Sequence, residues 1–417
     1  MSKHIIDDVK RCLQCKNPPC QNGCPIGTPI RDVIALLQDN RLEEAGKMLF
    51  DNNPLSLVCS HVCHQENQCE GHCILEKRGK PVLISAIEKY ISDFYLNIYQ
   101  PVPSTKENGK IAIIGSGPAG ITIAFSLARK NYDVTIFEGH ERIGGVLRYG
   151  IPEFRLPKSI IDRLVDTLYK SGVKIRPNTS IGTNLGVDDL FRDGFRAIFM
   201  GTGVWRPLRL NIKGESLGHV HYAIEYLKNP GVYRLGDSLT IIGAGNVAMD
   251  VARSAVRHGC RQVQVFCNLD ESGVTARPGE IVYAKIDGVK IEVMKSAVEI
   301  TDEGVIFADS EILVDDSGHK IVRPIAGTEK LERSDSVIIA VSQGPRSVIV
   351  SSTTGIDVNE NTGLVEVDYF GHTTREGVFA GGDVVTGAKT VVEAVQVSRR
   401  VADAMDKYVM EKYMGAE

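Results

Sequence analysis

The sequence predicts an α/β protein in which two nested Rossmann-like dinucleotide-binding domains follow an α-helical, cysteine-rich domain. Three observations predict this fold class. Eight of the ten cysteines lie within the first 73 of 417 residues. A glycine-rich strand-turn-helix pattern occurs once from Lys110 and again from Ser238. A third strand-turn-helix pattern near the C-terminus returns to the first of these units.

Composition excludes several classes of function. Lys and Arg number 48 and Asp and Glu 52, so the net charge of -4 leaves no basic excess for nucleic acid. The uncharged run from Ile111 to Ala128 is interrupted by GSGPAG, which predicts a strand, a turn and a helix rather than a membrane span. The start, MSKHIIDDVKRC, has no apolar signal segment. We therefore expect a cytoplasmic protein with no nucleic-acid or membrane partner.

The N-terminal cysteines form two quartets whose spacing is typical of iron-sulfur proteins. The first has the spacing C-x2-C-x4-C-x3-C followed by Pro25, and the second C-x3-C-x5-C-x3-C. In ferredoxin-type runs, three close thiolates bind one cubane while the Cys before Pro ligates another cluster. The spacing predicts two [4Fe-4S] clusters with ligands interleaved between the quartets, which consist of Cys12, Cys15, Cys20, Cys24, Cys59, Cys63, Cys69 and Cys73.

Two other uses of these thiols have to be weighed. A disulfide framework belongs to small secreted domains and is disfavoured in a reducing compartment. Zinc is the stronger alternative, because His61, His64 and His72 lie among the second quartet. However, Thr28 as N-cap and Pro29 as first helical residue predict a helix to about Asp39, and a second helix is expected over 42–50. Helices between the quartets favour clusters, and the histidines are expected on the surface or beside the ligands.

The first dinucleotide pattern is KIAIIGSGPAG, a strand that runs into a helix ending near Lys130. Gly115 makes the tight turn, Gly117 lets a pyrophosphate approach the backbone, and Gly120 lets helix and strand touch. The next strand, DVTIFE, ends in Glu138, which would accept hydrogen bonds from ribose hydroxyls.

The second pattern is SLTIIGAGNVAMDVARSA, with Gly243, Gly245 and Ala248 in the corresponding positions. Two such sites imply two dinucleotides. The strand end that selects the nicotinamide cofactor has Asn268, neither an acid for a free ribose nor an Arg for a 2'-phosphate. Arg277 could reach a phosphate, although a solvated loop arginine is the more expected role. Cys260 and Cys267 are expected to be small buried hydrophobic residues.

The third pattern, GVFAGGDVVTGAKTVVEAV, predicts a strand, a turn with Asp383 and a helix from about Thr390. Such a helix N-terminus suits a developing anion, for example a reduced flavin ring. We therefore predict a helical iron-sulfur domain at 1–105, one nucleotide-binding unit at 106–220 and 331–417, and a second nucleotide-binding unit inserted in it at 221–330.

Taken in order, the eight-cysteine segment, IIGSGPAG, GGVLRYGIPEFRLPK, GTGVWRP, IIGAGNVAMD and FAGGDVVTGAKT resemble the family of the small subunit of bacterial glutamate synthase and the amino-terminal half of dihydropyrimidine dehydrogenase. The resemblance spans nearly the whole chain and implies a glutathione-reductase-like arrangement. It implies FAD on Gly115, Gly117, Pro118, Ala119, Gly120, Glu138, Gly144, Gly145, Val146, Arg155, Ile181, Gly382, Asp383, Thr390 and Val391. It implies NAD(P)H on Gly243, Ala244, Gly245, Asn246 and Val247, with Asn268 and Arg277 nearby.

The resemblance also implies a division of the cluster ligands. One cluster would be bound by Cys12, Cys15, Cys20 and Cys73, and the other by Cys24, Cys63, Cys69 and Glu88, which leaves Cys59 over. An exposed helical glutamate paired with a lysine is the alternative for Glu88. Members that read a phosphate have Arg where Asn268 stands, so NAD(H) is favoured over NADP(H).

What the resemblance implies about function follows from electron chemistry. A nicotinamide gives two electrons as hydride and a cubane accepts one at a time, so a flavin must convert between them, with no catalytic side-chain base. We expect an NAD(P)H-oxidising subunit of a hetero-oligomer that passes electrons to a partner subunit, of glutamate synthase or dihydropyrimidine dehydrogenase type, or to a ferredoxin. The alternatives are a subunit of a flavin-based bifurcating transhydrogenase and a redox-sensing module stapled by zinc or a cluster.

Overall fold

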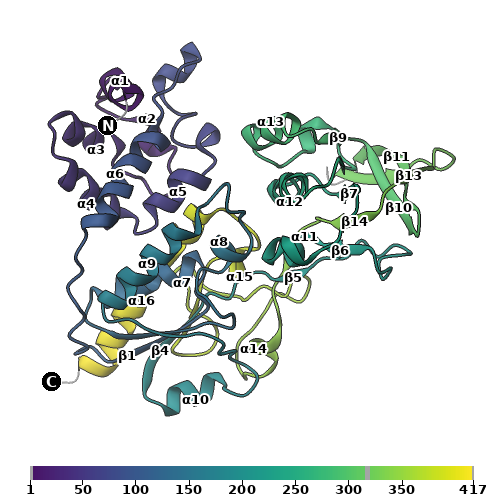
Figure 1. The fold of residues 1–417 in the computed structure, drawn as a ribbon. Helices are drawn as coiled ribbons and strands as arrows, with labels where there is room; N and C mark the ends of the chain where they lie inside the picture. The colour runs from purple at the N-terminus through teal and green to yellow at the C-terminus, as the bar shows by residue number, and fades with distance from the viewer. Residues whose placement is uncertain (1–2, 315–319, 416–417) are drawn as a thin grey trace. The chain divides into compact units, whose positions relative to one another are not determined.

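The computed structural model describes residues 3–314 and 320–415, which form two compact units (Figure 1). The first unit contains residues 1–148, 153–204 and 345–417, and the second contains 149–152 and 205–344. The chain thus leaves the first unit, builds the second and returns. The domain boundaries 105/106, 220/221 and 330/331 stay a prediction, because they rest on sequence pattern alone.

The N-terminal part of the first unit is helical. Apolar residues at helical spacing bury one face of each helix in a common core that includes Ile34, Leu49 and Ile87. The expected helices after the first quartet are present, but the first begins at Ile30 with Pro29 as N-cap, so the assignment of Thr28 as N-cap was wrong. The Thr28 hydroxyl instead accepts a hydrogen bond from Asn52 and contacts the Cys24 sulfur. The elements are α1 (Lys3–Arg11), α2 (Pro19–Asn22), α3 (Ile30–Gln38), α4 (Leu42–Asn52), α5 (Ser56–Val62), η1 (Gln65–Asn67), η2 (Ile74–Arg78) and α6 (Ile84–Ile98).

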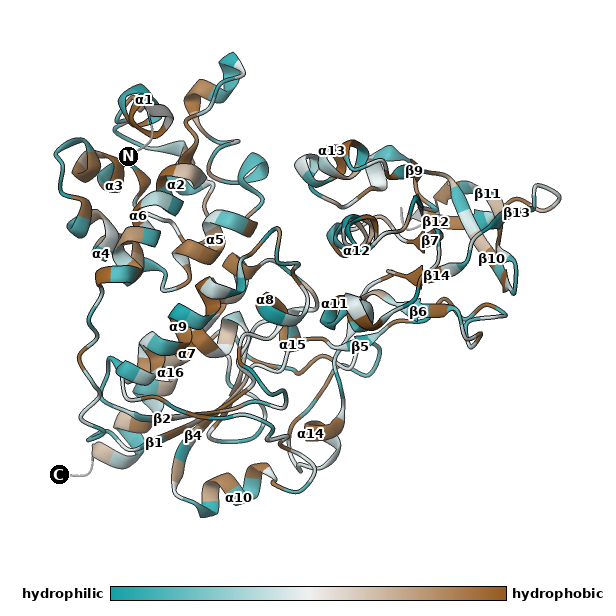
Figure 2. Ribbon diagram, viewed as in Figure 1, coloured by the Kyte–Doolittle hydropathy of each residue, from teal (hydrophilic) through white to brown (hydrophobic). Residues whose placement is uncertain are grey.

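A five-stranded parallel sheet follows in the same unit, in the order β16-β4-β1-β2-β3. Its central strands are apolar along their length, as the brown colour of β1 and β4 shows in Figure 2, because helices cover both faces of a parallel sheet. The strands are β1 (Lys110–Ile114), β2 (Asp133–Phe137), β3 (Lys174–Arg176), β4 (Phe195–Met200) and β16 (Val378–Ala380). The helices are α7 (Pro118–Ala128), α8 (Val146–Tyr149), α9 (Lys158–Lys170), α10 (Val187–Arg192), α14 (Val348–Ser351), α15 (Asp383–Thr386), α16 (Val391–Val409) and the π-helical turn η5 (Met410–Met414).

The second unit repeats this plan with the parallel order β6-β14-β7-β8-β9. An antiparallel sheet and a short ribbon, β5 with β15, complete it. Its parallel strands and helices are β6 (Val220–Tyr222), α11 (Ala223–Lys228), η3 (Pro230–Val232), β7 (Ser238–Ile242), α12 (Asn246–Arg257), β8 (Gln262–Phe266), η4 (Glu271–Gly273), α13 (Pro278–Ile286), β9 (Lys290–Glu292) and β14 (Ser336–Ile339). The others are β5 (Arg206–Pro207), β10 (Lys295–Thr301), β11 (Gly304–Val314), β12 (Lys320–Pro324), β13 (Lys330–Arg333) and β15 (Gln343–Gly344).

This architecture confirms the predicted fold class: a helical segment precedes two Rossmann-like sheets, one inserted in the other. β16 pairs with β4, so the last strand joins the first sheet after the whole second unit has been built. The run 111–128 is strand, turn and helix, as predicted. Among the described residues no helix combines the length and the apolar character needed to cross a bilayer.

Candidate redox site

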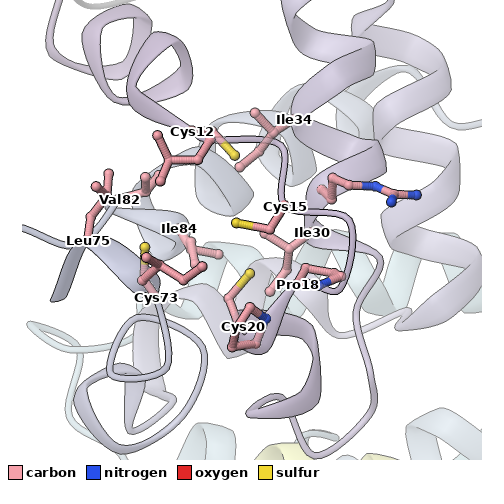
Figure 3. Close-up of a pocket in the computed structure, with 14 residues that line it drawn as sticks. Cys12, Cys15, Pro18, Cys20, Ile30, Ile34, Cys73, Leu75, Val82 and Ile84 are labelled. Atoms are coloured by element: carbon pink, nitrogen blue, oxygen red, sulfur yellow. The ribbon is translucent and has the colours of Figure 1, made fainter. Parts of the chain in front are cut away.

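Four thiols from both quartets line one pocket in the helical segment. Cys12 and Cys15 follow α1, Cys20 lies in α2, and Cys73 immediately precedes η2. Figure 3 shows their sulfur atoms directed into a common space whose walls are apolar, with Ile30, Ile34, Leu75, Val82 and Ile84 among them. We call this space the first thiol pocket. It brings together the four cysteines that the resemblance assigns to one cluster.

Burial and the neighbouring thiols make Cys12 and Cys20 hard to ionise in the absence of a positive charge. Burial raises the pKa of Cys20 to about 11, and the neighbouring Cys73, Cys12 and Cys15 add to the shift. The pKa of Cys12 is also raised by burial, and Cys15 and Cys73 contribute. A cationic iron cluster would remove this penalty, because it stabilises all four thiolates at once. The residues present therefore fit such a group.

A second group of ligand side chains lies around the start of α6. Burial raises the pKa of Cys69, and its charged neighbours include Glu88 and Cys24. The pKa of Cys63 is raised by its hydrogen bond to Cys59 and by burial, with Glu88 and Cys69 also near. The structure thus brings together the proposed second set, which we call the second thiol group: Cys24, Cys63, Cys69 and Glu88.

Glu88 is not the exposed helical residue of the alternative interpretation. Burial raises the pKa of its carboxyl group to about 8, and Glu70 adds to the shift. Cys59, the thiol left over, is buried in α5 and accepts a hydrogen bond from the Asn53 amide at 3.3 Å. A buried carboxyl group beside thiols is a suitable oxygen ligand for a metal cluster.

Among the described residues, the thiols do not converge as the four ligands of a single zinc ion would. Four thiolates around one zinc ion, each about 2.3 Å from it, would lie about 3.8 Å apart. In the described part of the chain, no three histidine, cysteine or acidic side chains converge in this way. The four thiols of the first pocket are instead spread around a space, as ligands of a larger group would be.

The glycines of the first Rossmann turn have the geometry that each predicted role requires. Gly115 has φ 97°, and a Cβ there would lie 2.6 Å from the Gly201 carbonyl oxygen. A Cβ on Gly120 would lie 2.0 Å from the Gly115 oxygen, so helix α7 touches the end of β1. In contrast, a Cβ on Gly117, the N-cap of α7, would meet nothing within 4 Å. This open backbone at a helix N-terminus fits a pyrophosphate.

Glu138 lies at the end of β2 and is held by a residue that the motif did not single out, Ser116. The Ser116 backbone N–H and hydroxyl donate to one carboxylate oxygen at 3.1 and 2.5 Å, and the His140 N–H donates to the other at 2.8 Å. Burial alone would raise the pKa of Glu138, but the hydrogen bonds from His140 and Ser116 outweigh it and lower the pKa. Glu138 is therefore a fixed, buried carboxylate beside the glycine turn.

Other predicted flavin contacts gather around the same turn. The Gly144 N–H donates to the Ser116 backbone oxygen at 3.1 Å, and a Cβ on Gly145 would lie 2.8 Å from the Gly117 Cα. Gly382 approaches from the other side, where a Cβ would lie 3.0 Å from that of Ala119. The structure thus brings together the predicted residues Gly115, Gly117, Pro118, Ala119, Gly120, Glu138, Gly144, Gly145, Val146 and Gly382.

The remaining predicted flavin contacts lie on three segments. Asp383 begins α15, and burial raises its pKa to about 6. Thr390 caps α16 in a capping box with Glu393, and Val391 is the first helical residue. Ile181 is buried in the core below the sheet with Ile114 and Phe137, and Arg155 lies half-buried before α9. Their roles as flavin contacts stay a prediction.

The second Rossmann turn repeats the first. Gly243 has φ 115°, a Cβ on Gly245 would meet only the Thr275 hydroxyl, at 3.4 Å, and Ala248 is fully buried. Gly245 is the N-cap of α12, where Asn246 and Val247 follow, and Ala244 is buried before it. This turn can hold a second pyrophosphate.

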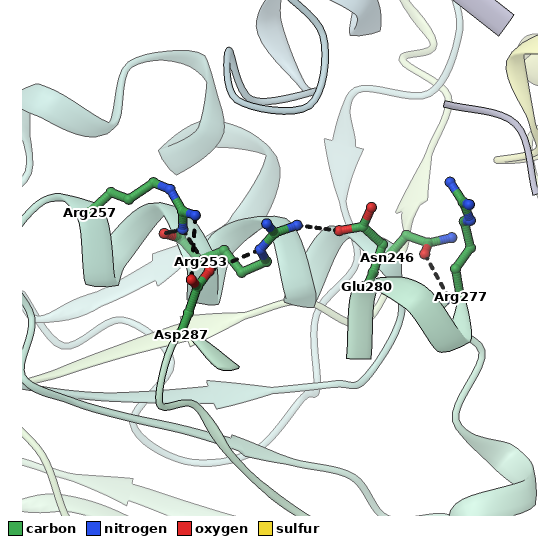
Figure 4. A network of polar contacts seen from close by, with 6 residues as sticks. All are labelled: Asn246, Arg253, Arg257, Arg277, Glu280 and Asp287. Atoms are coloured by element: carbon green, nitrogen blue, oxygen red, sulfur yellow. Dashed lines mark hydrogen bonds and ion pairs between the residues drawn. The ribbon is translucent and has the colours of Figure 1, made fainter. Parts of the chain in front are cut away.

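The residues that would contact the adenosine end lie beyond β8. Asn268 is exposed at the end of this strand, and Arg277 is the half-buried N-cap of α13. The Arg277 N–H donates to the Asn246 side-chain oxygen at 2.9 Å, so the two helix N-termini are adjacent (Figure 4). Cys260 and Cys267 are buried in the apolar core, as predicted.

A buried ionic network that sequence reasoning missed holds α12 against α13 (Figure 4). The Arg253 guanidinium donates to Glu280 at 2.5 Å and to Asp287 at 3.0 Å, and Arg257 donates to Asp287 at 2.7 Å. Arg253 and Glu280 are both buried. No local sequence signal marks this pairing, because the partners lie 27 and 34 residues apart.

Two family models match the chain. Residues 1–98 match the 4Fe-4S cluster domain described as domain II of dihydropyrimidine dehydrogenase, and 109–400 match the pyridine nucleotide-disulphide oxidoreductases. Among solved structures, FprA of Mycobacterium tuberculosis in complex with NADPH covers 76% of this chain and is itself covered to 86%, with a TM-score of 0.61 and 17% identity. Thioredoxin reductase of T. acidophilum covers 72% and is covered to 99%, with a TM-score of 0.56 and 22% identity. These two structures share the fold.

Curated relatives match nearly the whole chain. The glutamate synthase [NADPH] small chain of Escherichia coli is 30% identical over 95% of this chain and 89% of its own length. The NAD-dependent dihydropyrimidine dehydrogenase subunit PreT of Salmonella typhimurium is 31% identical over 97% and 94%. The beta subunit of the NADP(+)-dependent formate dehydrogenase of Moorella thermoacetica is 30% identical over 94% of this chain and 60% of that subunit. The chain therefore belongs to the family of iron-sulfur flavoprotein oxidoreductases that includes the glutamate synthase small chain and PreT, and its cofactors are iron-sulfur, FAD and a nicotinamide dinucleotide.

Proposed function

We propose that this chain is the NADH-oxidising input subunit of a hetero-oligomeric enzyme, with FAD and two [4Fe-4S] clusters connecting the nicotinamide to a partner subunit. The observation that supports this most strongly is the sorting of the ligand side chains. Cys12, Cys15, Cys20 and Cys73 line one pocket, and Cys24, Cys63, Cys69 and Glu88 are electrostatic neighbours of one another, which supports two separate sets of ligands. Each group supplies four ligands, which is the number a cubane takes.

The second thiol group is connected to the flavin side of the first unit by a chain of hydrogen bonds. Arg399 of α16 donates to the Asn52 side-chain oxygen at 2.9 Å, and the Asn52 amide donates to the Thr28 hydroxyl at 3.3 Å. That hydroxyl lies 3.3 Å from the Cys24 sulfur. Gln396, also on α16, donates to the backbone oxygen of Pro25. These contacts support the order flavin, second thiol group, first thiol pocket.

The residues around the two Rossmann turns would bind and orient the dinucleotides. When bound, FAD would take a hydride from the nicotinamide and release the electrons singly. The open backbones at Gly117 and Gly245 would each receive a pyrophosphate, and Glu138, held by Ser116, would lie at the ribose. The capped N-terminus of α16 would face the flavin ring and favour added negative charge there. No side chain has to act as acid or base.

The choice of NADH over NADPH rests on Asn268. This residue is exposed and uncharged at the end of β8, where a 2'-phosphate would need a cation. Arg277 is the nearest candidate for such a cation, and its backbone is tied to Asn246. NADH should therefore be the better donor, and an Asn268→Arg variant should shift the preference toward NADPH.

The test is rapid mixing of the anaerobic protein with NADH or NADPH, followed by absorbance and electron paramagnetic resonance. We expect flavin bleaching first and then spectra of reduced iron-sulfur clusters, with NADH giving the higher kcat/KM. Iron near eight atoms per chain is expected for two cubanes, that is about four per cluster. Zinc in place of iron, or clusters that NADH cannot reduce, would refute the proposal. Native mass spectrometry of the purified complex should show the partner subunit.

A further inference from the structure

Three large apolar side chains around the first thiol pocket are exposed to solvent. Leu13 and Ile74 line the pocket, yet 58% and 45% of their surfaces are exposed. Leu83, between the lining residues Val82 and Ile84, is 46% exposed. Single exposed apolar residues need no explanation, but three around one pocket mark a contact surface.

The same surface is basic although the chain as a whole is acidic. The bases at its edge are Lys10, Lys16, Lys77, Arg78 and Lys80, all exposed. Glu76 is the exposed acid of η2, and it is outnumbered there by Lys77 and Arg78. Arg11 and Arg31 do not add to this charge, because they pair with Asp8 and Asp32. In residues 7–16 and 74–83, which contain or flank the lining residues Leu13 and Ile74, these five exposed bases outnumber the two exposed acids, Asp7 and Glu76.

The position of this surface suits an exit for electrons. The second thiol group is the one tied to α16 through Pro25 and Asn52. The first pocket is built by α1, α2 and η2, and Figure 1 shows α1 on the side of the helical segment away from α16. A cluster that passes electrons to another protein must lie close to the surface.

We propose that this surface, which we call the exit face (Leu13, Lys16, Ile74, Lys77, Arg78, Lys80 and Leu83), docks a partner whose own face is acidic around an apolar centre and holds a one-electron acceptor. The inference rests on the proposed function. Oxidation of one NADH to NAD+ releases one proton and two electrons. Each electron would pass to the acceptor in a separate one-electron transfer, so two transfers would balance the oxidation of one NADH.

The exposed bases of the exit face could instead serve only to balance the negative charge of the cluster. Charge reversal separates these roles. The test variant is K77E/R78E, on the exposed side of η2. The matched control is R192E/K407E, two exposed bases on α10 and α16. An acidic ferredoxin with two [4Fe-4S] clusters is the probe, and the readouts are its dissociation constant by thermophoresis, its rate of reduction and the iron content of each variant.

We expect the wild-type chain to bind the ferredoxin, and binding to weaken as NaCl rises above about 0.1 M, where the Debye length is about 10 Å. The K77E/R78E variant should bind about tenfold more weakly and reduce the ferredoxin correspondingly more slowly, with unchanged iron and unchanged reduction of its own clusters by NADH. An uncharged change, Leu13→Ser, should also weaken binding, and R192E/K407E should not.

Three results would refute the proposed exit face. The first is a wild type that does not bind the ferredoxin, and the second is binding of K77E/R78E as tight as that of the control. The third is a lower iron content in K77E/R78E than in the wild type, since its weaker binding would then follow from a lost cluster. Failure of the proposed function would look different. In that case NADH would not reduce the clusters of the wild-type chain, whatever its affinity for the ferredoxin.

Discussion

At the scale of single residues, three glycines in one turn do three different things. Gly115 has a positive φ that other residues rarely adopt, Gly120 has no room for a side chain, and Gly117 has open space above it. The fold requires glycine at position 120, whereas at position 117 only ligand binding would require it. Adding a single methyl group at each of these two positions tests the difference.

Gly117→Ala should fold normally and lose flavin. Its φ of -70° suits alanine and its Cβ would touch nothing, but the methyl group would occupy the space where the pyrophosphate approaches. Flavin affinity should fall about tenfold or more, which corresponds to about 1.4 kcal/mol. Gly120→Ala should instead destabilise the fold by more than about 3 kcal/mol, because its Cβ would strike a backbone oxygen that cannot move.

Flavin titration of apoprotein and urea unfolding distinguish the two variants. Equal flavin affinity of Gly117→Ala and the wild type would show that the space above the helix N-terminus is not used. A stable Gly120→Ala protein would contradict the close contact between α7 and β1.

Glu88 supports a second residue-scale prediction. Its buried carboxyl group near Cys63 and Cys69 should be a cluster ligand. Glu88→Ala should therefore reduce the iron content from about eight toward about four atoms per chain and remove one of two reduced-cluster spectra. Glu76→Ala, which changes an exposed acid beside the other thiol pocket, is the control and should keep both. Full iron in Glu88→Ala would leave Cys59 as the better candidate.

At the scale of elements, the pairing of α12 with α13 sets the geometry of the second Rossmann turn, where we propose that the nicotinamide cofactor binds. Asn246 at the start of α12 accepts from the backbone of Arg277 at the start of α13. The Arg253, Glu280 and Asp287 network fixes the same pair of helices farther along. Polar contacts thus hold the two helices together at both ends. The contact at the helix starts is a neutral hydrogen bond, and the contact farther along is a network of ion pairs that includes the buried Arg253 and Glu280.

Arg253→Met should destabilise the protein by about 3–5 kcal/mol, because it removes the buried ion pair between Arg253 and the Glu280 carboxylate. The double variant R253M/E280M should recover most of this loss. Arg257→Met, which removes a partly exposed partner of the same Asp287, should cost about 1 kcal/mol or less. Urea unfolding measures all three, and a double variant no more stable than Arg253→Met would contradict the argument.

The Asp287 carboxyl group makes the contribution of this network to the free energy of unfolding depend on pH. Burial alone would raise the pKa of Asp287, but hydrogen bonds from Arg257 and Arg253 lower it below its ordinary value of 3.8. Its contribution to stability is therefore complete above pH 3.8 and is lost as the pH falls through the lower folded value. The penalty of Arg253→Met should accordingly shrink in acid and stay constant near neutral pH.

At the scale of the whole molecule, contacts between distant segments decide how the cofactor sites communicate. Thr28 illustrates this, because its hydroxyl joins Cys24 to Asn52 and, through it, to Arg399 near the other end of the chain. With Asn52 donating to it, the hydroxyl is left to donate to the Cys24 sulfur. Hydrogen bonds to sulfur raise the reduction potential of a cluster.

Thr28→Val should therefore lower the potential of the cluster that we propose Cys24 binds and slow its reduction by NADH, without changing the start of α3. Thr28→Ser keeps the hydroxyl and should behave as the wild type. A redox titration followed by electron paramagnetic resonance gives the potentials. An unchanged potential in Thr28→Val would show that the hydroxyl does not act on the sulfur.

The sequence by itself determined the local units of this protein: both glycine turns, the helices between the cysteine quartets, the capped start of α16 and the apolar strands. Each depends on residues close together in the chain, where backbone sterics and hydrophobic periodicity act directly. The division of the thiols into two sets was already implied by the family resemblance. The hydrogen bonds of Ser116 to Glu138, the Arg253 network and the connection from Arg399 to Asn52 were decided only by the tertiary structure. The hydrogen bonds of Ser116 to Glu138, Arg253 to Glu280 and Arg399 to Asn52 join residues 22, 27 and 347 positions apart, and no local pattern encodes which distant side chains will meet when their elements pack.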